Sequence, residues 1–366
     1  MLGACNGLEG KGCAEASRTV AAVSGCGYLA AAMPLSLSRD RVVALLQAAK
    51  AKRIAVVGDA MLDVYLRGDV ERISPEAPVP VVRVRERRFA LGGAANVVQN
   101  VRGLGAACDF VAATGKDAGA TTLREMLGAI GVAPDSLVTI DRPTTTKTRI
   151  VARGQQVVRV DEEDDHDLDP ADVARLVASA DRAIDAADAL ILEDYNKGVL
   201  VPAVIERVMA RASARKIPVV VDPKYRNFFV YRGATVFKPN RRELESALGA
   251  EVDLEHPDAL PAALSKLGVE SLLLTLGDRG MALISQNGSV RRIPTVAREV
   301  YDVVGAGDTV TAYLAAVLAA GGNSAEAAIV ANYAAGVEVS KSGAATVSAD
   351  EVIDAYDDFA RSRESA

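Results

Sequence analysis

Residues 302–309 combine two glycines with two aspartates directly before a run of helix-forming residues that ends near Leu318. Glycines at the start of a helix leave backbone N–H groups free to point at an anion, and the helix dipole adds a favourable potential there. A phosphoryl group fits such a site. In the first helical turn Asp308 would lie beside that group, where its carboxylate could accept a proton from an attacking hydroxyl. The stretch predicts phosphoryl transfer, with Asp308 as the base and an anion hole formed by Gly305, Ala306 and Gly307.

A Gly-Ala-Gly triplet also fits a tight turn or close helix packing, so its interpretation depends on the scaffold around it. Short apolar strands alternate with longer helical patterns along most of the chain. The predicted strands are 53–59, 109–113, 188–193, 218–222, 234–237 and 271–276, and the predicted helices are 40–50, 94–104, 118–130, 170–186, 200–215, 240–248 and 257–267. This alternation predicts an α/β fold with a mostly parallel central sheet sandwiched by helices.

Several predicted strands end on carboxylates, namely Asp59, Glu193 with Asp194, and Asp222. Ligands of parallel sheets collect at the carboxyl ends of the strands, so these side chains are predicted to border one crevice.

Two segments, 64–90 and 141–163, break the α/β rhythm with alternating residues that indicate half-exposed antiparallel strands. We predict that they form a small β lid over the sheet edge. Apolar residues such as Val79, Val81 and Val82 would be an aggregation hazard at an open edge. We therefore expect the lids of two subunits to pair in a homodimer.

The bulk composition limits the class of protein. The 366 residues are 50% hydrophobic, which is enough for one large domain, predicted over 37–360 after a disordered leader at 1–36. A net charge of −6 argues against a nucleic-acid partner, because phosphate-backbone binding normally needs a basic face. No run approaches the roughly 18 apolar residues of a membrane span. Four cysteines without paired spacing and two histidines show no zinc or disulfide pattern.

The stretch 302–309 resembles the C-terminal signature of the PfkB-type carbohydrate kinases, and 91–96 (Leu-Gly-Gly-Ala-Ala-Asn) resembles their N-terminal signature. The two stand in the right order and separation. The resemblance covers roughly 53–350 and includes the stretches 57–63, 72–80, 146–149, 194–198 and 237–240. It implies a ribokinase-like fold and transfer of the γ-phosphoryl group of ATP to a sugar hydroxyl.

Within this family the chain is most similar to the kinases of D-glycero-β-D-manno-heptose 7-phosphate. That similarity implies phosphorylation of the C1 hydroxyl, which yields the heptose 1,7-bisphosphate for ADP-heptose and lipopolysaccharide synthesis in the cytoplasm. In many relatives a nucleotidyltransferase domain follows the kinase. Because this sequence stops at Ala366, we expect a monofunctional kinase.

The resemblance also assigns the ATP side of the site. Residues 240–243 match the family's N-x-x-E motif, in which Glu243, together with Asn240, helps hold Mg²⁺ largely through water. The same residues also fit a helix cap in which Asn240 and Glu243 bond reciprocally. Residues 275–280 follow a strand and are expected near the ATP phosphates, although a glycine turn there also fits a plain hairpin. The predicted nucleotide contacts are Asn240, Glu243, Thr275, Gly277, Gly280 and, in a late helix, Asn332.

On the acceptor side, carboxylates and amides are the groups that can read sugar hydroxyls, and glycines allow close approach of the backbone. Cationic side chains bind phosphate through charge-assisted hydrogen bonds, although each could instead be a surface cation. The predicted sugar contacts are Asp59, Asp63, Gly92, Gly93, Asn96 and Asp194, and the predicted 7-phosphate contacts are Lys147, Arg149, Asn196 and Lys197.

Two alternatives remain open from the residues alone. The first is a kinase of another sugar or of a nucleoside, which would not need the basic groups Lys147, Arg149 and Lys197 in its pocket. The second is a catalytically silent sugar-binding regulator on the same fold, which would not need Asp308 and its glycines.

Overall fold

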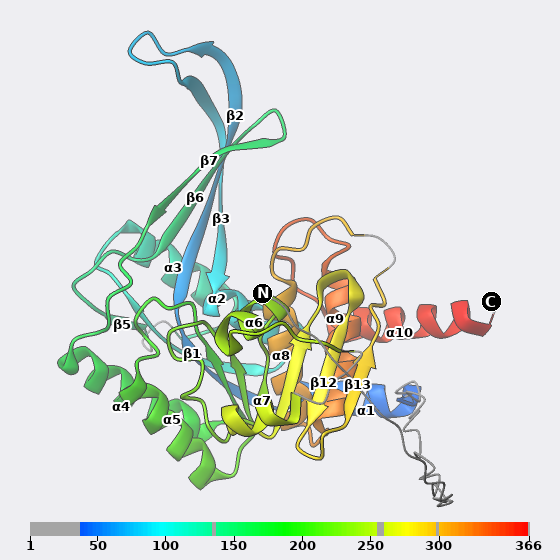
Figure 1. Ribbon diagram of the computed structural model, residues 1–366. Coiled ribbons are helices and arrows are strands. Elements are labelled where there is room, and N and C mark those ends of the chain that lie inside the picture. Colours follow the sequence, from blue (N-terminus) through cyan, green and yellow to red (C-terminus); the bar gives the residue numbers. More distant parts are fainter. Residues whose placement is uncertain (1–36, 134–136, 255–259, 298–299, 365–366) are drawn as a thin grey trace, which may run out of the picture. The chain divides into compact units, whose positions relative to one another are not determined.

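The computed structural model describes residues 37–133, 137–254, 260–297 and 300–364 (Figure 1). The predicted leader at 1–36 lies outside these ranges. A central nine-stranded sheet runs through the described residues, in the order β13 (Val290–Ile293), β12 (Met281–Ser285), β11 (Ser271–Thr275), β10 (Val236–Phe237), β9 (Val219–Asp222), β8 (Ala189–Glu193), β1 (Arg53–Gly58), β4 (Ala107–Thr114) and β5 (Leu137–Thr139).

The pairs from β5 to β11 are parallel, and only β11–β12 and β12–β13 are antiparallel. The predicted mostly parallel sheet is therefore confirmed. The sequence patterns did not predict β5, β12 and β13. The short 3₁₀ turn η3 (Gly277–Arg279) reverses the chain after β11, so that β12 pairs antiparallel with β11, and a second reversal at 286–289 pairs β13 antiparallel with β12.

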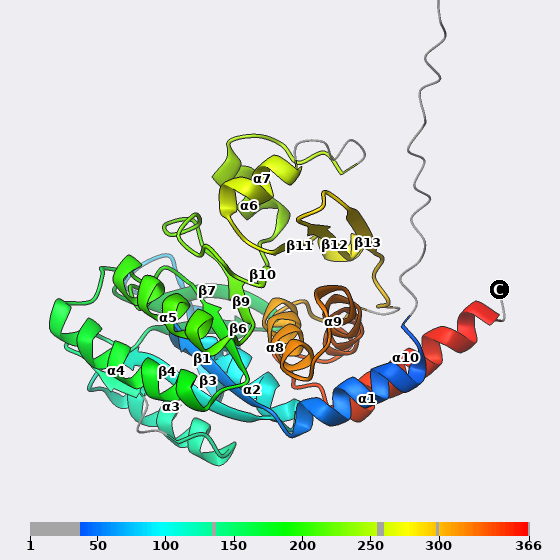
Figure 2. The ribbon, with the colours of Figure 1, turned by 90° about the horizontal axis from the view of Figure 1, so that it is seen from below.

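Helices cover both faces of this sheet. One face packs against α1 (Arg39–Lys50), α2 (Ala94–Leu104), α3 (Ala118–Ala129), α8 (Ala306–Ala319), α9 (Ser324–Glu338) and α10 (Ala349–Glu364). The other packs against α4 (Pro170–Ala186), α5 (Pro202–Arg215), α6 (Arg241–Leu248) and α7 (Leu260–Leu267). Figure 2 shows α1 alongside α10, and α4 alongside α5.

Alternation along the strands explains this sandwich. In β1, Ile54 and Val56 belong to the core on one face, whereas Ala55 and Val57 belong to the core on the other, and all four side chains are fully buried. Successive strand residues point to opposite faces, so a continuous apolar strand needs cover on both sides. The strand therefore has to lie inside the molecule, and polar functional side chains can be placed only at its end.

The two segments predicted as a lid form a separate four-stranded sheet in the order β3 (Pro80–Gly93), β2 (Ala60–Ile73), β6 (Thr146–Ala152) and β7 (Gln155–Glu162), which stands above the main sheet in Figure 1. Two antiparallel hairpins, β2–β3 and β6–β7, build it. The central pair β2–β6 is parallel, which corrects the prediction of antiparallel strands throughout. The reason is that β2 and β6 are each the outgoing strand of their hairpin.

Within the described ranges, no helix is long and apolar enough to cross a membrane.

Candidate active site

The start of α8 has the geometry predicted for the glycine-rich stretch. Gly305 is the N-cap residue with φ of +97°, a backbone conformation that side chains with a Cβ rarely adopt. A Cβ there would also lie 3.0 Å from Asn96 Nδ2 and 3.2 Å from Glu338 Oε1. The N–H groups of Ala306, Gly307 and Asp308 follow in the first turn, where a helix supplies no carbonyl partner for them. They are therefore available to an anion.

Asp308 is buried in this first turn and both of its carboxylate oxygens accept hydrogen bonds. Asn96 Nδ2 donates to Oδ2 at 2.7 Å, and the Tyr195 hydroxyl donates to Oδ1 at 3.1 Å. Burial raises the pKa of Asp308 to about 6, against the lowering effect of the hydrogen bond from Asn96. A carboxylate with a pKa near 6 is ionised at neutral pH and is a better proton acceptor than an exposed aspartate.

Behind Asp308 lies a buried cluster of charged groups at the ends of β8, β9 and β10. Glu193, Asp222 and Asp308 each place a carboxylate oxygen within 4.8 Å of the others. Lys238, which is 3% exposed, bonds Asp222 Oδ2 through Nζ at 2.7 Å. Burial and the nearby Asp222 hold the pKa of Glu193 well above its usual range, which favours the neutral form of this carboxyl group. The predicted crevice of strand-end carboxylates is thus formed by Glu193 and Asp222, together with the base.

A cavity of about 390 Å³ opens between this cluster and the lid; we call it the lid-side cavity. Six of the ten predicted acceptor-side residues line it: Asp63, Gly92, Gly93, Asn96, Lys147 and Arg149. Gly93 has a φ of +56°, and a Cβ on it would lie 2.6 Å from the Asp59 carbonyl oxygen. The glycine pair is thus needed where β3 returns to the base of β2.

Two of the other four acceptor-side residues, the carboxylates Asp59 and Asp194, lie behind the cavity wall. Asp59 is 1% exposed and accepts backbone N–H bonds from Tyr195, Lys197 and Val199 at 2.8, 3.0 and 3.2 Å. Asp194 accepts bonds from the Asn196 N–H and the Tyr231 hydroxyl. Both carboxylates hold loop 194–199 and neither is among the residues that line the lid-side cavity, so the geometry gives no support to their predicted contact with the sugar.

The remaining two residues, Asn196 and Lys197, belong to the same loop. Asn196 is buried with a φ of +55°, and Lys197 pairs with Glu163 at 2.8 Å. Neither side chain is among those that line the lid-side cavity. Their predicted contact with a 7-phosphate therefore has no geometric support in this structure.

The second cavity, of about 370 Å³, lies beside the β11–β12 hairpin; we call it the hairpin-side cavity. The predicted nucleotide residues Asn240, Thr275, Gly277, Gly280 and Asn332 line it, together with apolar side chains such as Val300, Val303 and Val339. Asn332 donates from Nδ2 to the Pro294 carbonyl oxygen at 2.9 Å. The two cavities share three lining residues, Asn240, Thr275 and Gly307, so they meet at the start of α8. A donor in one cavity and an acceptor in the other would face each other across Gly307.

Glu243 lines the lid-side cavity and combines two structural contacts. Its Oε2 accepts the Asn240 N–H at 2.8 Å while Asn240 Oδ1 accepts the Glu243 N–H at 2.9 Å, which is a complete capping box for α6. Its Oε1 forms an ion pair with Lys224. A hydrated Mg²⁺ could still be held through water by Glu243 and Asn240, because Mg²⁺ keeps much of its hydration shell.

Sequence reasoning missed several cavity residues, namely Arg159, Tyr195, Lys224 and Lys238. Three of them stand one or two residues from groups that the patterns singled out, Asp194, Asp222 and Asn240, because each follows the end of a buried strand. Position after a strand was therefore the available signal. Arg159 had no such signal, since only the register of β7 opposite β6 directs it into the cavity.

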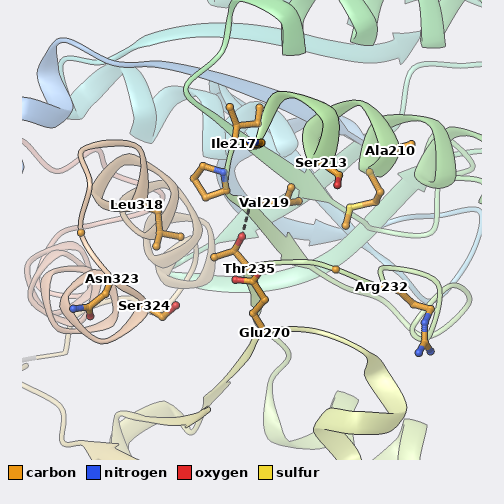
Figure 3. A pocket seen from close by; sticks show the side chains of 15 residues that line it. Ala210, Ser213, Ile217, Val219, Arg232, Thr235, Glu270, Leu318, Asn323 and Ser324 are labelled. Atoms are coloured by element: carbon orange, nitrogen blue, oxygen red, sulfur yellow. Dashed lines mark hydrogen bonds between the residues drawn. The ribbon is translucent and has the colours of Figure 1, made fainter. Parts of the chain in front are cut away.

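A third cavity, of about 820 Å³, lies at the amino ends of β9, β10 and β11, and Asp308 is not among its lining residues. Figure 3 shows side chains that line it. Residues such as Lys216, Thr235, Glu270 and Ser324 line it, and the Thr235 hydroxyl accepts the Val219 N–H at 3.1 Å. Ligands of parallel sheets bind at the opposite, carboxyl end. The active-site candidate is therefore the pair of cavities at the start of α8.

The fold is that of known small-molecule kinases. It matches ribokinase from Arabidopsis thaliana, solved in complex with ribose and ATP, with a TM-score of 0.66 and 22% identity over 83% of this chain and 98% of that one. It also matches phosphofructokinase-2 from Escherichia coli, solved with potassium, with a TM-score of 0.68 and 17% identity over 85% of this chain and 100% of that one. At such identities the likeness shows the fold alone, which is the predicted ribokinase-like fold.

The sequence places the chain further. It belongs to the pfkB family carbohydrate kinases, with residues 51–351 matched, and is therefore a sugar kinase, a phosphotransferase. Similar curated proteins are the bifunctional protein HldE of Rhodospirillum rubrum, 46% identical over 310 residues, and that of Azorhizobium caulinodans, 47% identical over 304 residues. Each alignment covers 82% of this chain, but only 61% and 63% of the respective relative. The chain thus spans about three-fifths of the length of these relatives.

Proposed function

We propose that this kinase phosphorylates the C1 hydroxyl of D-glycero-β-D-manno-heptose 7-phosphate with ATP, forming the heptose 1,7-bisphosphate for ADP-heptose synthesis. The observation that carries the proposal is the charge of the lid-side cavity. Five cations line it against four carboxylates, whereas the whole chain has a net charge of −6. An acceptor that already bears a phosphate explains this local excess of positive charge.

Three of these cations stand on the lid strands. Arg149 and Arg159 are direct cross-strand partners in β6–β7, and Lys147 is two residues from Arg149. Like charges directly opposite each other destabilise a sheet unless counter-charges intervene. Asp63 bonds Arg149 at 2.5 Å and Asp161 bonds Arg159 at 2.9 Å, so the carboxylates hold the guanidinium groups in place beside the cavity. We infer that the 7-phosphate binds among Lys147, Arg149 and Arg159.

Around the reacting hydroxyl, Asp308 accepts the proton as the acceptor oxygen bonds to the γ-phosphorus and the bond from that phosphorus to ADP breaks. The N–H groups at the start of α8 stabilise the charge on the transferring group. Lys238 adds a buried positive charge there, because its Nζ would lie 3.7 Å from a Cβ on Gly307. Asn96 lines the cavity, and its buried Oδ1 has no hydrogen-bond partner among the described residues, which makes it a candidate acceptor for a sugar hydroxyl.

ATP would lie in the hairpin-side cavity, with its adenine ring against the apolar lining and its phosphates toward Thr275 and Gly307. Mg²⁺, held through water near Asn240 and Glu243, would neutralise charge on the phosphate groups. We place this reaction in the cytoplasm, where ATP is supplied.

The acceptor is tested by ATP turnover with Mg²⁺ on the heptose 7-phosphate, the same heptose without phosphate, ribose, fructose 6-phosphate and adenosine. We expect strong preference for the heptose phosphate. In Arg149→Met and Lys147→Met variants the KM for that acceptor should rise about 10- to 100-fold, since each loses a charge-assisted hydrogen bond worth about 1.5–3 kcal/mol. The KM for the unphosphorylated heptose should change little in either variant.

The matched control is Arg85→Met, because Arg85 is a lid arginine paired with Asp69 and does not line the cavity. Equal turnover of the unphosphorylated heptose, or equal losses on both acceptors, would contradict a phosphate site at the lid.

We also propose a homodimer through the lid. Arg159 lines the cavity, so its neighbours Val158 and Val160 project from the opposite face, where they are 45% and 47% exposed. Val84 and Phe89 of β3 are also exposed, so the lid presents apolar groups on both outer strands. We expect light scattering to give the mass of two chains at micromolar concentration.

The double change Val158→Glu with Val160→Glu should shift this mass to one chain, because it charges the outer lid face. Ala178→Glu, which adds a charge on an exposed position of α4, is the control and should leave the mass unchanged. A monomer for the unmodified chain would rule the dimer out.

A further inference from the structure

The Asp308 carboxylate accepts hydrogen bonds from two side chains, Asn96 and Tyr195, and Tyr195 has no role assigned so far. Asn96 comes from the first turn of α2, whereas Tyr195 comes from the loop after β8. The Tyr195 hydroxyl donates to Oδ1 at 3.1 Å, and its ring lines the lid-side cavity. We propose that Tyr195 is a positioning residue for the base: together with Asn96 it fixes the plane of the Asp308 carboxylate toward the acceptor hydroxyl. The inference rests on the proposed role of Asp308.

The loop that carries Tyr195 is itself fixed from beneath, by the buried carboxylate of Asp59. Its Oδ2 accepts the N–H groups of Tyr195 and Lys197, and its Oδ1 accepts that of Val199. The Asp59 N–H in turn donates to the Glu193 carbonyl oxygen at 3.1 Å, which joins the ends of β1 and β8. Asp59 therefore acts on the base through Tyr195, two steps away from any ligand.

The tyrosine ring is held on its other side as well. Lys224 Nζ lies 5.5 Å from the ring centroid, and Lys224 is paired with Glu243 of α6. Because the Tyr195 backbone is anchored and a cation lies against its ring, the side chain loses little further conformational freedom when its hydroxyl donates to Asp308. The hydroxyl is thus preorganised for Oδ1, in the way that effective positioning requires.

The hydrogen bond also matters for the charge of the base. Asp308 faces Asn96 of α2, Tyr195, Glu193 of β8, Asp222 of β9, Lys238 after β10, and Glu338 of α9. Burial and Asp222 raise the pKa of Asp308, whereas Asn96, Lys238 and Tyr195 lower it. Burial and the nearby Asp308 hold the pKa of Tyr195 well above its usual range, so the hydroxyl keeps its proton and remains a donor.

The test is the pH profile of kcat in the full chain with Tyr195→Phe, measured on the best acceptor of the wild type. We expect kcat at pH 7 to fall about tenfold or more while the acceptor KM changes less than about threefold, because the ring and the cavity wall remain. The acidic limb of the profile should move to higher pH, since a donor that lowers the pKa of the base is gone. Raising the pH should recover part of the loss.

The matched control is Tyr313→Phe, which removes another buried hydroxyl with one hydrogen bond, 2.9 Å to the Val347 carbonyl oxygen, further along α8. It should lower stability by a similar amount and leave the pH profile unchanged. If Tyr195→Phe and Tyr313→Phe gave the same profile, or if Tyr195→Phe raised only the acceptor KM, the positioning role would be overturned. If the wild type turned over none of the acceptors, the proposed function itself would be wrong. That outcome is separate from a failure of the positioning role, which is judged only on a wild type that has activity.

Discussion

Asp308→Asn should strongly lower turnover while making the folded protein more stable. Loss of the base should lower kcat by a factor of about 10² to 10⁴, because general-base catalysis typically contributes that much. The substrate KM values should change little, since the shape of the site is nearly preserved, although an amide oxygen can accept from only one of the two positions at which Asp308 accepts hydrogen bonds. In the wild type kcat should fall as the pH drops below about 6, where Asp308 takes up its proton.

The stability gain follows from the same pKa. The folded-state pKa of Asp308, about 6, lies above its ordinary value of 3.8, so the folded state binds this proton more tightly than the unfolded chain. The wild type therefore loses stability as the pH rises from about 4 through 6, and at pH 7 the cost is about 3 kcal/mol. The asparagine variant avoids this cost and should unfold at higher urea concentration at pH 7 than the wild type, with the gap closing near pH 4.

Asp109→Asn is the control, because Asp109 is a half-buried surface partner of Arg53 and lies at the far end of β4 from the site. It should change neither kcat nor the pH dependence of unfolding in this manner. If Asp308→Asn kept wild-type turnover, Asp308 would not be the base; if it lowered stability at pH 7, the buried anion would not be a strained group.

The parts of the fold that the sequence predicted are those governed by local pattern. Apolar runs such as Ile54–Val57 favour buried strands, and turn residues mark their ends, so most strands and helices of the sandwich were placed within a few residues, whereas β5, β12, β13 and α10 were not predicted. The direction of β2 against β6 was missed, because strand pairing depends on which segments meet in space and not on either segment alone. The same limit hid Arg159, whose orientation depends on its register with Arg149.

The site shows the corresponding limit for side chains. The glycine-rich helix start indicated Asp308, and residue type with the family signatures indicated Asn96 and Asp63; all three line the lid-side cavity. These signals did not separate Asp59 from the three, because its burial and its three backbone bonds arise from loop 195–199 folding back over it. A carboxylate that reads a ligand and one that anchors a loop have the same local sequence signal. Only the tertiary contacts tell them apart.

Lys238→Met should be among the most damaging single changes outside the catalytic groups. Lys238 is the cation of the buried cluster, and its loss leaves Asp222 beside Asp308 and Glu193 without its hydrogen-bonded counter-charge. Breaking a buried ion pair from one side typically costs about 3–5 kcal/mol, so the urea midpoint should fall sharply. Activity should fall too, because Lys238 lowers the pKa of Asp308 and its removal leaves more of the base protonated at pH 7.

The double variant Lys238→Met with Asp222→Asn should recover much of the lost stability, because it removes both charges and not only one. Glu193→Gln should leave stability near that of the wild type at pH 7, because the raised pKa of Glu193 favours its neutral form, which the amide resembles. That result would indicate that the cluster holds the Lys238 ammonium beside the carboxylates of Asp222 and Asp308, with Glu193 as a neutral acid. If Glu193→Gln instead stabilised the protein by several kcal/mol, Glu193 would be ionised, and Lys238 would be balancing three negative charges next to the base.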